Sequence, residues 1–175
     1  EASRIGRVRT WLTGGVTLNV ILGSVLSLIT LVPFLADILP GGANSFKRLR
    51  EWPQTVEVLE TRFQEGHEGQ AFTMVATDKR IIFYDLIYYG RPDTAPVKMW
   101  MYQTHPVNHA ELTAPLPAQD GPVLIVNYHD NYVDEMQADF ERLVALPPVE
   151  IDLGGGKTRR WDMWAGYGYT PTSTR

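Results

Sequence analysis

The stretch FTMVATDKRIIFYDLIYYG, residues 72–90, changes from a strand pattern to a helix pattern across one short polar turn. Residues 72–76 form a short, mostly apolar run, as expected for a buried strand. Asp78 stands where a helix N-cap is expected, and Gly90 ends the helix predicted over 79–89. Three residues share the apolar face of this helix: Ile82, Leu86 and Tyr89. A strand that leads directly into a helix indicates an α/β domain.

The same alternation of elements continues on both sides of this stretch. In chain order we predict a helix over 46–64, strands over 97–102 and 122–127 with a loop over 104–119 between them, a helix over 131–146, and a closing hairpin of strands 149–153 and 160–164. Pro53 either interrupts the first helix or begins a second one, because proline suits a first helical turn. Pro147 and Pro148 end the last helix. The predicted fold is an α/β sandwich over 46–170 with a mixed sheet, parallel in its first part.

A long apolar run precedes this domain. Residues 11–39 read WLTGGVTLNVILGSVLSLITLVPFLADIL, and no charged side chain occurs from residue 10 to residue 36. A helix needs roughly 20 apolar residues to cross the hydrocarbon core of a membrane. We therefore predict one transmembrane helix over 11–39 and a hinge over 40–45. A cleaved signal peptide is the alternative, but its apolar region usually has only about 7–15 residues.

Charges and small residues around the run predict its orientation and its neighbours. Arg4, Arg7 and Arg9 precede it, so the positive-inside rule places segment 1–10 in the cytoplasm and the domain, with a tail over 171–175, outside. In a bacterium this is the inner membrane with a periplasmic domain. Small residues allow another helix to approach, and the predicted partners are the lipid bilayer and other integral membrane subunits. The helix-packing residues are Gly14, Gly15, Gly23 and Ser27.

The composition limits the function classes. The chain of 175 residues has 16 basic and 20 acidic side chains, a net charge of -4 and a pI near 5.5. A nucleic-acid partner is not expected, because phosphate binding requires a basic surface. The sequence contains no cysteine, which excludes disulfides, thiolate zinc sites and a cysteine nucleophile.

One motif resembles a phosphate-binding loop and another resembles a metal site. A structural explanation is favoured for both, so we predict neither a metal nor another cofactor. The run of glycines before Lys157 resembles a phosphate-binding loop, but Ile151 stands where that motif requires its first glycine, and a hairpin turn is favoured. His105, His109 and Glu111 have a spacing that could share a metal on a helix. Prolines around them indicate a loop, so we expect surface or loop-anchoring roles.

The end of the first strand is the candidate ligand site. Open α/β sheets bind ligands beyond the carboxyl ends of their strands, near helix N-termini. The candidate ligand-binding residues are Asp78, Arg80, Asn108 and His109. A capping aspartate with solvated basic neighbours is the favoured interpretation. No Ser/His/Asp arrangement or carboxylate pair is indicated, and we predict no catalytic residue in this chain. An aromatic band is expected to pack in the core or at an interface: Tyr84, Tyr88, Tyr89, Trp100 and Tyr102.

Several stretches in a fixed order carry a family resemblance: 35–40, 43–52, 75–80, 88–91, 106–113 and 122–126. Together they resemble the C-terminal end of bacterial lipid-linked-sugar glycosyltransferases of the aminoarabinose-transferase and protein-mannosyltransferase type. In that family a bundle of membrane helices ends in a last span and a periplasmic α/β domain. The resemblance implies transfer of a sugar from a polyprenyl phosphate to a lipid or protein acceptor. The catalytic carboxylates of the family lie in loops that precede this region, so none is carried over to this chain.

Three interpretations follow. The favoured one is a membrane-anchored periplasmic accessory subunit of a larger complex, derived from such a domain and non-catalytic on its own. The second is the C-terminal fragment of a complete membrane glycosyltransferase. The third is a periplasmic small-ligand module that uses the edge of the sheet at Asp78.

Overall fold

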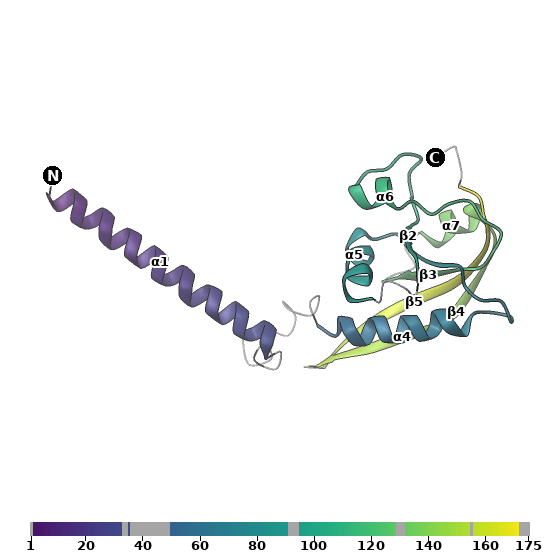
Figure 1. The fold of residues 1–175 in the computed structure, drawn as a ribbon, viewed down its shortest axis with the longest axis horizontal. Coiled ribbons are helices and arrows are strands. Elements are labelled where there is room, and N and C mark those ends of the chain that lie inside the picture. Colours follow the sequence, from purple (N-terminus) through teal and green to yellow (C-terminus); the bar gives the residue numbers. More distant parts are fainter. Residues whose placement is uncertain are drawn as a thin grey trace. The chain divides into compact units, whose positions relative to one another are not determined.

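The computed structural model describes residues 2–32, 35, 50–90, 95–128, 132–154 and 156–171. Figure 1 shows the order of the elements along the chain. The residues form two compact units: Glu1–Arg50 with Leu153–Lys157, and Glu51–Asp152 with Thr158–Arg175. The predicted hinge over 40–45 lies outside the described residues, as do 172–175 of the predicted tail.

The first unit contains one long helix, α1 (Ala2–Leu31). Within it, the segment Gly6–Leu28 has 23 residues and a mean hydropathy of 1.5. This segment is long and apolar enough for a membrane span, and a signal sequence would meet the same criteria. Every side chain from residue 6 to residue 28 is exposed. The helix begins nine residues before the predicted span, so most of segment 1–10 is helical as well. Arg50 donates a hydrogen bond of 3.0 Å to the carbonyl of Leu153 in the same unit.

The second unit is an α/β domain built on a five-stranded mixed sheet in the order β2-β1-β3-β5-β4. Both β2 and β3 pair with β1 in parallel, and β5 pairs with β3 in the antiparallel direction. This confirms the predicted α/β class with a mixed sheet and the parallel first part of that sheet. The strands are β1 (Met74–Thr77), β2 (Val97–Met99), β3 (Val123–Asn127), β4 (Phe140–Gly154) and β5 (Lys157–Tyr169).

Helices cover both faces of this sheet, because successive side chains of β1 point to opposite faces and each face packs against a helix. Val75 lies on the face covered by α4 (Trp52–Glu65) and α5 (Arg80–Tyr89), where it lines a cavity with Val56 and Leu86. Ala76 points the other way and belongs to the core beneath α7 (Val133–Asp139). That core contains Ala76, Trp100, Leu116, Val123, Ile125, Met136, Phe140, Trp164 and Tyr169.

The first helix of the domain has a proline in its first turn. Pro53 occupies the first turn of α4, so it begins the helix and does not interrupt one. Residues 46–49 of the predicted helix lie outside the described residues. Trp52 and Leu59 of α4 are buried, as its apolar spacing indicates.

The helix predicted over 131–146 is wrong in its second half. The structure ends α7 at Asp139, and the chain continues as the edge strand β4. The apolar spacing that suggested a helix also suits this strand, whose Phe140 enters the core. Neither Pro147 nor Pro148 ends a helix; both lie in β4, since a strand at the edge of a sheet tolerates a missing N–H. The hairpin with β5 is therefore much longer than predicted.

Smaller differences concern loops and strand ends. The strands expected over 72–76 and 97–102 are β1, displaced by two residues or fewer, and the shorter β2. The loop predicted over 104–119 contains a short helix, α6 (His109–Thr113). Gly154 and Gly156 have φ values of 76° and 69°, and β5 follows at once, which confirms a hairpin turn in place of a phosphate loop.

Candidate functional site

The chain leaves the neighbouring strands β1 and β3 toward opposite faces of the sheet. After β1 it enters α5 on one face, and after β3 it enters α7 on the other. The carboxyl ends of the two parallel strands therefore meet at a topological switch point, where open α/β sheets bind ligands. Thr77 ends β1 and Asn127 ends β3 at this edge.

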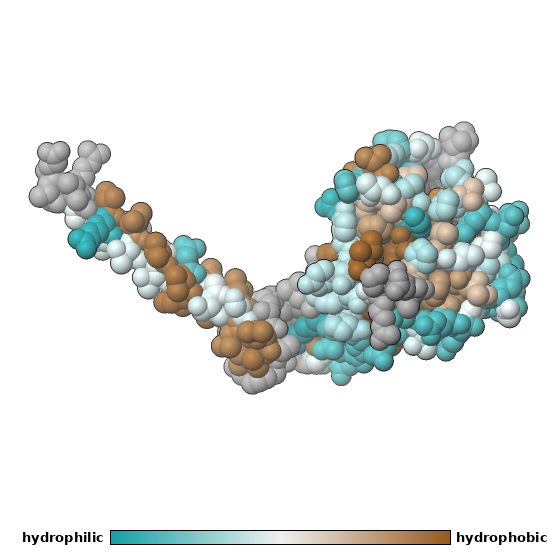
Figure 2. Space-filling view, in the orientation of Figure 1, coloured by the Kyte–Doolittle hydropathy of each residue, from teal (hydrophilic) through white to brown (hydrophobic). Residues whose placement is uncertain are grey.

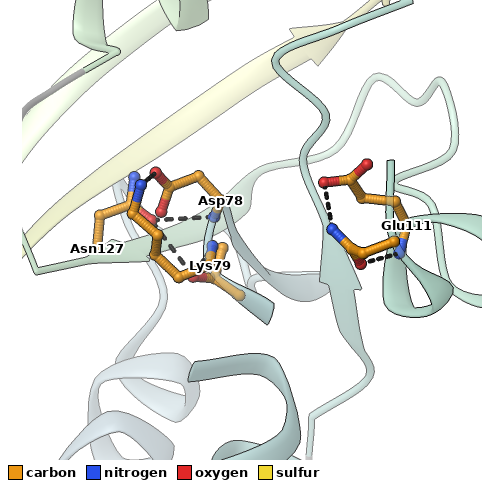
Figure 3. Close-up of polar contacts among 6 residues, drawn as sticks. Asp78, Lys79, Glu111 and Asn127 are labelled. Carbon is orange, nitrogen blue, oxygen red and sulfur yellow. Dashed lines mark hydrogen bonds and ion pairs between the residues drawn. The ribbon is translucent and has the colours of Figure 1, made fainter. Parts of the chain in front are cut away.

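Four side chains from these two strand ends form a polar cluster, and Figure 3 labels three of them: Asp78, Lys79 and Asn127. The amide oxygen of Asn127 accepts hydrogen bonds from the backbone N–H of Asp78 at 3.2 Å and from the hydroxyl of Thr77 at 3.4 Å. The ammonium of Lys79 lies 2.9 Å from Oδ2 of Asp78. The same ammonium lies 5.1 Å from the ring centre of Tyr132, next to α7. The cluster thus ties β1 to β3 and to the start of α7.

Among the residues that the structure describes, two buried polar atoms of this cluster have no hydrogen-bond partner: Oδ1 of Asp78 and Nδ2 of Asn127. The Asp78 side chain is 4% exposed and Asn127 is 1% exposed. An unpaired buried polar group typically costs about 1–3 kcal/mol. One atom is an acceptor and the other a donor, so a hydroxyl group or a water molecule supplies what both lack.

Asp78 does not cap α5, which corrects that prediction. The N-cap residue is Lys79, and no side chain there accepts a hydrogen bond from the helix. The reason is the ion pair with Lys79, which holds the Asp78 carboxylate away from the first turn. The N-cap side chain of α5 therefore satisfies none of the N–H groups of that turn.

Three of the four predicted ligand-binding residues come together. Arg80, Asn108 and His109 line one hollow of about 340 Å³ between α5 and α6. Tyr84 also lines it, and its hydroxyl lies 3.4 Å from Nδ1 of His109. Asp78 is not among the lining residues and belongs to the switch-point cluster instead.

The Asn108 side chain has a structural role at this hollow. Its amide oxygen accepts a hydrogen bond of 3.1 Å from the backbone N–H of Glu111, and its amide nitrogen donates to the Glu111 carboxylate at 2.7 Å. Glu111 also accepts from the backbone N–H of Val107 at 2.7 Å. This capping box starts α6. The Glu111 carboxylate, which a metal site at this motif would need as a ligand, already accepts hydrogen bonds from Val107 and Asn108. Among the residues that the structure describes, no group of three or more His, Asp or Glu side chains could hold a metal ion.

One titratable group at the hollow has a shifted pKa. Burial raises the pKa of the Asp85 carboxyl above its ordinary value, and the positive charge of Arg159 partly opposes this rise. Asp85 is consequently more easily protonated than an exposed aspartate.

Comparison of the chain with protein-family models, with curated proteins and with solved structures found no match. The glycosyltransferase resemblance therefore stays a prediction. The candidate site is defined by its geometry alone.

Two members of the switch-point cluster were not identified from the sequence. Asn127 was assigned only to a strand, although a polar residue at the end of an apolar strand is itself a signal in a parallel sheet. Tyr132 gives no such signal, because its approach to Lys79 depends on where α7 starts.

The predicted helix-packing glycines lie on the exposed surface of α1. A methyl group added to Gly14, Gly15 or Gly23 would meet nothing within 4 Å. At 100° per residue, Gly15, Gly23 and Ser27 follow one ridge, and Gly14 lies about 100° from Gly15. Gly15 leaves a notch lined by Trp11, Leu12, Val16, Asn19 and Val20.

Proposed function

We propose that the chain is a membrane-anchored accessory subunit, with its α/β domain on the periplasmic side of a bacterial inner membrane. The observation that supports this most is the exposed apolar surface of α1 from Gly6 to Leu28. In water such a surface is unfavourable, and lipid or other membrane helices would cover it. The domain itself is non-catalytic in this proposal and acts within a larger complex.

The polar side chains of α1 suit a bilayer. Asn19 donates a hydrogen bond of 2.8 Å to the carbonyl of Gly15, and Thr13 donates one of 2.9 Å to Arg9. These bonds satisfy polar groups within the helix, which lowers the cost of placing them in lipid. The notch at Gly15 and the ridge that continues through Gly23 favour a neighbouring helix over lipid on this side.

The absence of cysteine allows a direct test of anchoring and orientation. We would label the full chain, carrying either Ala2→Cys or Gln137→Cys, with a membrane-impermeant thiol reagent in spheroplasts. Position 137 should react in intact spheroplasts and position 2 only after lysis. Release of the protein by an alkaline carbonate wash would show a cleaved signal peptide, and reversed labelling would contradict the orientation.

The partner is tested by a photo-reactive residue at position 23 of the full chain in its native membrane. Position 17 is the control, because Thr17 lies about 120° around the helix from Gly23. Cross-links to another membrane protein should form from position 23 and be several-fold weaker from position 17. A span that contacts only lipid from both positions would contradict the accessory-subunit proposal.

The alternative proposal, a C-terminal part of a complete membrane glycosyltransferase, rests on the family resemblance. It shares the span and the periplasmic domain with the first proposal and differs in what is encoded upstream. A coding region for many membrane helices directly before Glu1 would establish it. A start codon shortly before Glu1 would favour the separate subunit.

A second candidate function, binding of a small polar ligand, is supported by the unpaired Asp78 Oδ1 and Asn127 Nδ2. A ligand hydroxyl that donates to the first atom and accepts from the second would satisfy both. Thermal unfolding with a panel of small alcohols and polyols would detect such binding. If Asp78→Ala and Asn127→Ala shift no ligand response relative to an Arg160→Ala control, this candidate is abandoned.

A further inference from the structure

The outward side of α5 is apolar and aromatic even though its inward side already fills the core. Ile82, Phe83 and Leu86 are buried against the sheet and its neighbours. The residues on the other side remain exposed, and Tyr88 is 78% exposed. A helix that is apolar around most of its circumference has a second surface to cover. The exposed side chains of α5 are Ile81, Tyr84, Ile87, Tyr88 and Tyr89.

The short helix α6 extends this surface, because it packs beside α5. Val107, just before α6, and Leu112, within it, are both exposed. Figure 2 shows hydrophobic residues gathered over α5 and again over α6. We call the exposed residues of α5 together with Val107 and Leu112 the α5–α6 face.

The chemistry of the α5–α6 face is that of a membrane–water interface. Tyrosine has an apolar ring and a polar hydroxyl, and it is enriched where a protein meets lipid headgroups. Arg80 at the start of α5 is exposed and basic, which suits an anionic lipid surface. Asp85 is the one acidic residue of α5, and burial raises the pKa of its carboxyl.

The arrangement of the face suits a lipid surface. Its exposed apolar side chains stand on two adjacent helices, as they do in helices that lie in the plane of an interface. They surround a hollow that is lined by both polar and apolar side chains, among them Arg80, His109 and Ile81.

We propose that the α5–α6 face rests on the headgroup region of the bilayer that holds α1. This inference depends on the membrane anchor of the proposed function and adds which face of the domain meets the lipid. Residues 29–50 connect the span to the domain, and a chain of that length reaches at most about 75 Å. A domain of this size has a radius of gyration of only about 14 Å, so the tether lets this face reach the membrane. Tethering also raises the local concentration, so a weak affinity for lipid is enough.

The test uses the full chain in nanodiscs that contain phosphatidylcholine, phosphatidylglycerol and spin-labelled lipid. Single cysteines, introduced by Tyr88→Cys on α5, Gln137→Cys on α7 and Leu22→Cys in α1, each carry one fluorophore. Position 137 is the matched control, because Gln137 is exposed on the helix that covers the opposite face of the sheet. Spin-labelled lipid should quench the label at position 88 at least about twofold more than the label at position 137. Leu112→Cys supplies a second reporter on α6, should Tyr88→Cys impair folding.

The outcomes separate the inference from the anchor. If the label at position 22 is quenched but labels at 88 and 112 match that at 137, the inference is overturned and the anchor stands. That result includes the case in which the face binds a protein. If the label at position 22 is not quenched, the proposed anchor fails and the inference fails with it. Support requires, in addition, that Ile81→Ser with Ile87→Ser lowers quenching at position 88 to the control level and leaves position 22 unchanged.

Discussion

At the switch point, the Asp78 carboxylate is buried and forms an ion pair with the ammonium of Lys79. Replacing Lys79 by methionine leaves this carboxylate without its counter-ion. We expect Lys79→Met to lower the free energy of unfolding by about 1–3 kcal/mol, measured by urea denaturation at pH 7. The double variant with Asp78→Asn should lose less than the sum of the single losses, because the two residues act as a pair.

The control for this prediction is an ion pair of the same kind on the surface. Arg160 and Asp162 lie 3.0 Å apart, and the Arg160 side chain is 57% exposed. Arg160→Met should change the free energy of unfolding by no more than about 1 kcal/mol. Equal losses from Lys79→Met and Arg160→Met would show that burial at the switch point has no energetic effect.

A second ion pair makes the stability of the domain depend on acid pH. Arg142 donates two hydrogen bonds to Glu68, at 2.9 and 2.6 Å, and these lower the pKa of Glu68 below its ordinary value of 4.5. A lowered pKa in the folded state stabilises the fold above pH 4.5, and this contribution is lost as the pH falls through the folded-state pKa. Urea midpoints measured from pH 7 to pH 3 should therefore fall more steeply for the natural protein than for Glu68→Gln. Parallel curves would contradict the role of this pair.

Individual site residues were only partly predictable. Arg80 and His109 are both predicted ligand-binding residues, and the structure places both on one hollow. The role of Asp78 was predicted wrongly, because a capping position and an ion-pairing position look the same in sequence. The choice between them depends on Lys79 and on Asn127, which comes from a strand 49 residues away.

Among the elements, β5 leaves room for the Phe140 ring of β4 because Gly166 has no side chain. A Cβ atom at this position would lie 2.6 Å from Cε1 of Phe140 and 3.0 Å from Cδ1 of Ile125. Gly166→Ala should therefore overpack the core and lower the free energy of unfolding by about 1–3 kcal/mol. Adding Phe140→Leu should recover part of the loss, measured by thermal unfolding.

The matched control lies in the turn of the same hairpin. Gly156 has a φ of 69°, and a Cβ there would meet nothing within 4 Å. Gly156→Ala should lose about 1–2 kcal/mol through backbone strain alone. Because that cost does not involve packing, Phe140→Leu should not relieve it. Equal recovery in both variants would show that the core contact is not the cause.

Elements were predicted well where the local pattern and the fold agree. The strand β3 and the helix α5 stand close to their predicted bounds, because an entirely apolar run and a stripe at helical spacing each suit one structure. The region after α7 differs, because its apolar residues suit a helix and an edge strand equally. Pairing with β5 decides in favour of the strand, and only the sheet provides that partner.

For the molecule as a whole, the orientation in the membrane should depend on the basic residues before the span. We expect the joint change of Arg4, Arg7 and Arg9 to glutamine to invert a fraction of the molecules, because the charge bias is removed. The measurement is the share of Gln137→Cys protein that an impermeant thiol reagent labels in intact spheroplasts. This share should fall well below that of the parent protein. An unchanged share would mean that the domain, not the charge, sets the orientation.

Sequence alone was sufficient to determine the α/β class, the parallel start of the sheet and an N-terminal helix apolar enough for a membrane, because each follows from local periodicity and composition. Tertiary structure decided the rest. It joined Asn127 to Asp78, turned residues 140–146 into a strand, and left one side of α5 exposed and apolar. The physical reason is that pairing and burial depend on which segments meet in space, and residues far apart in the chain determine that together.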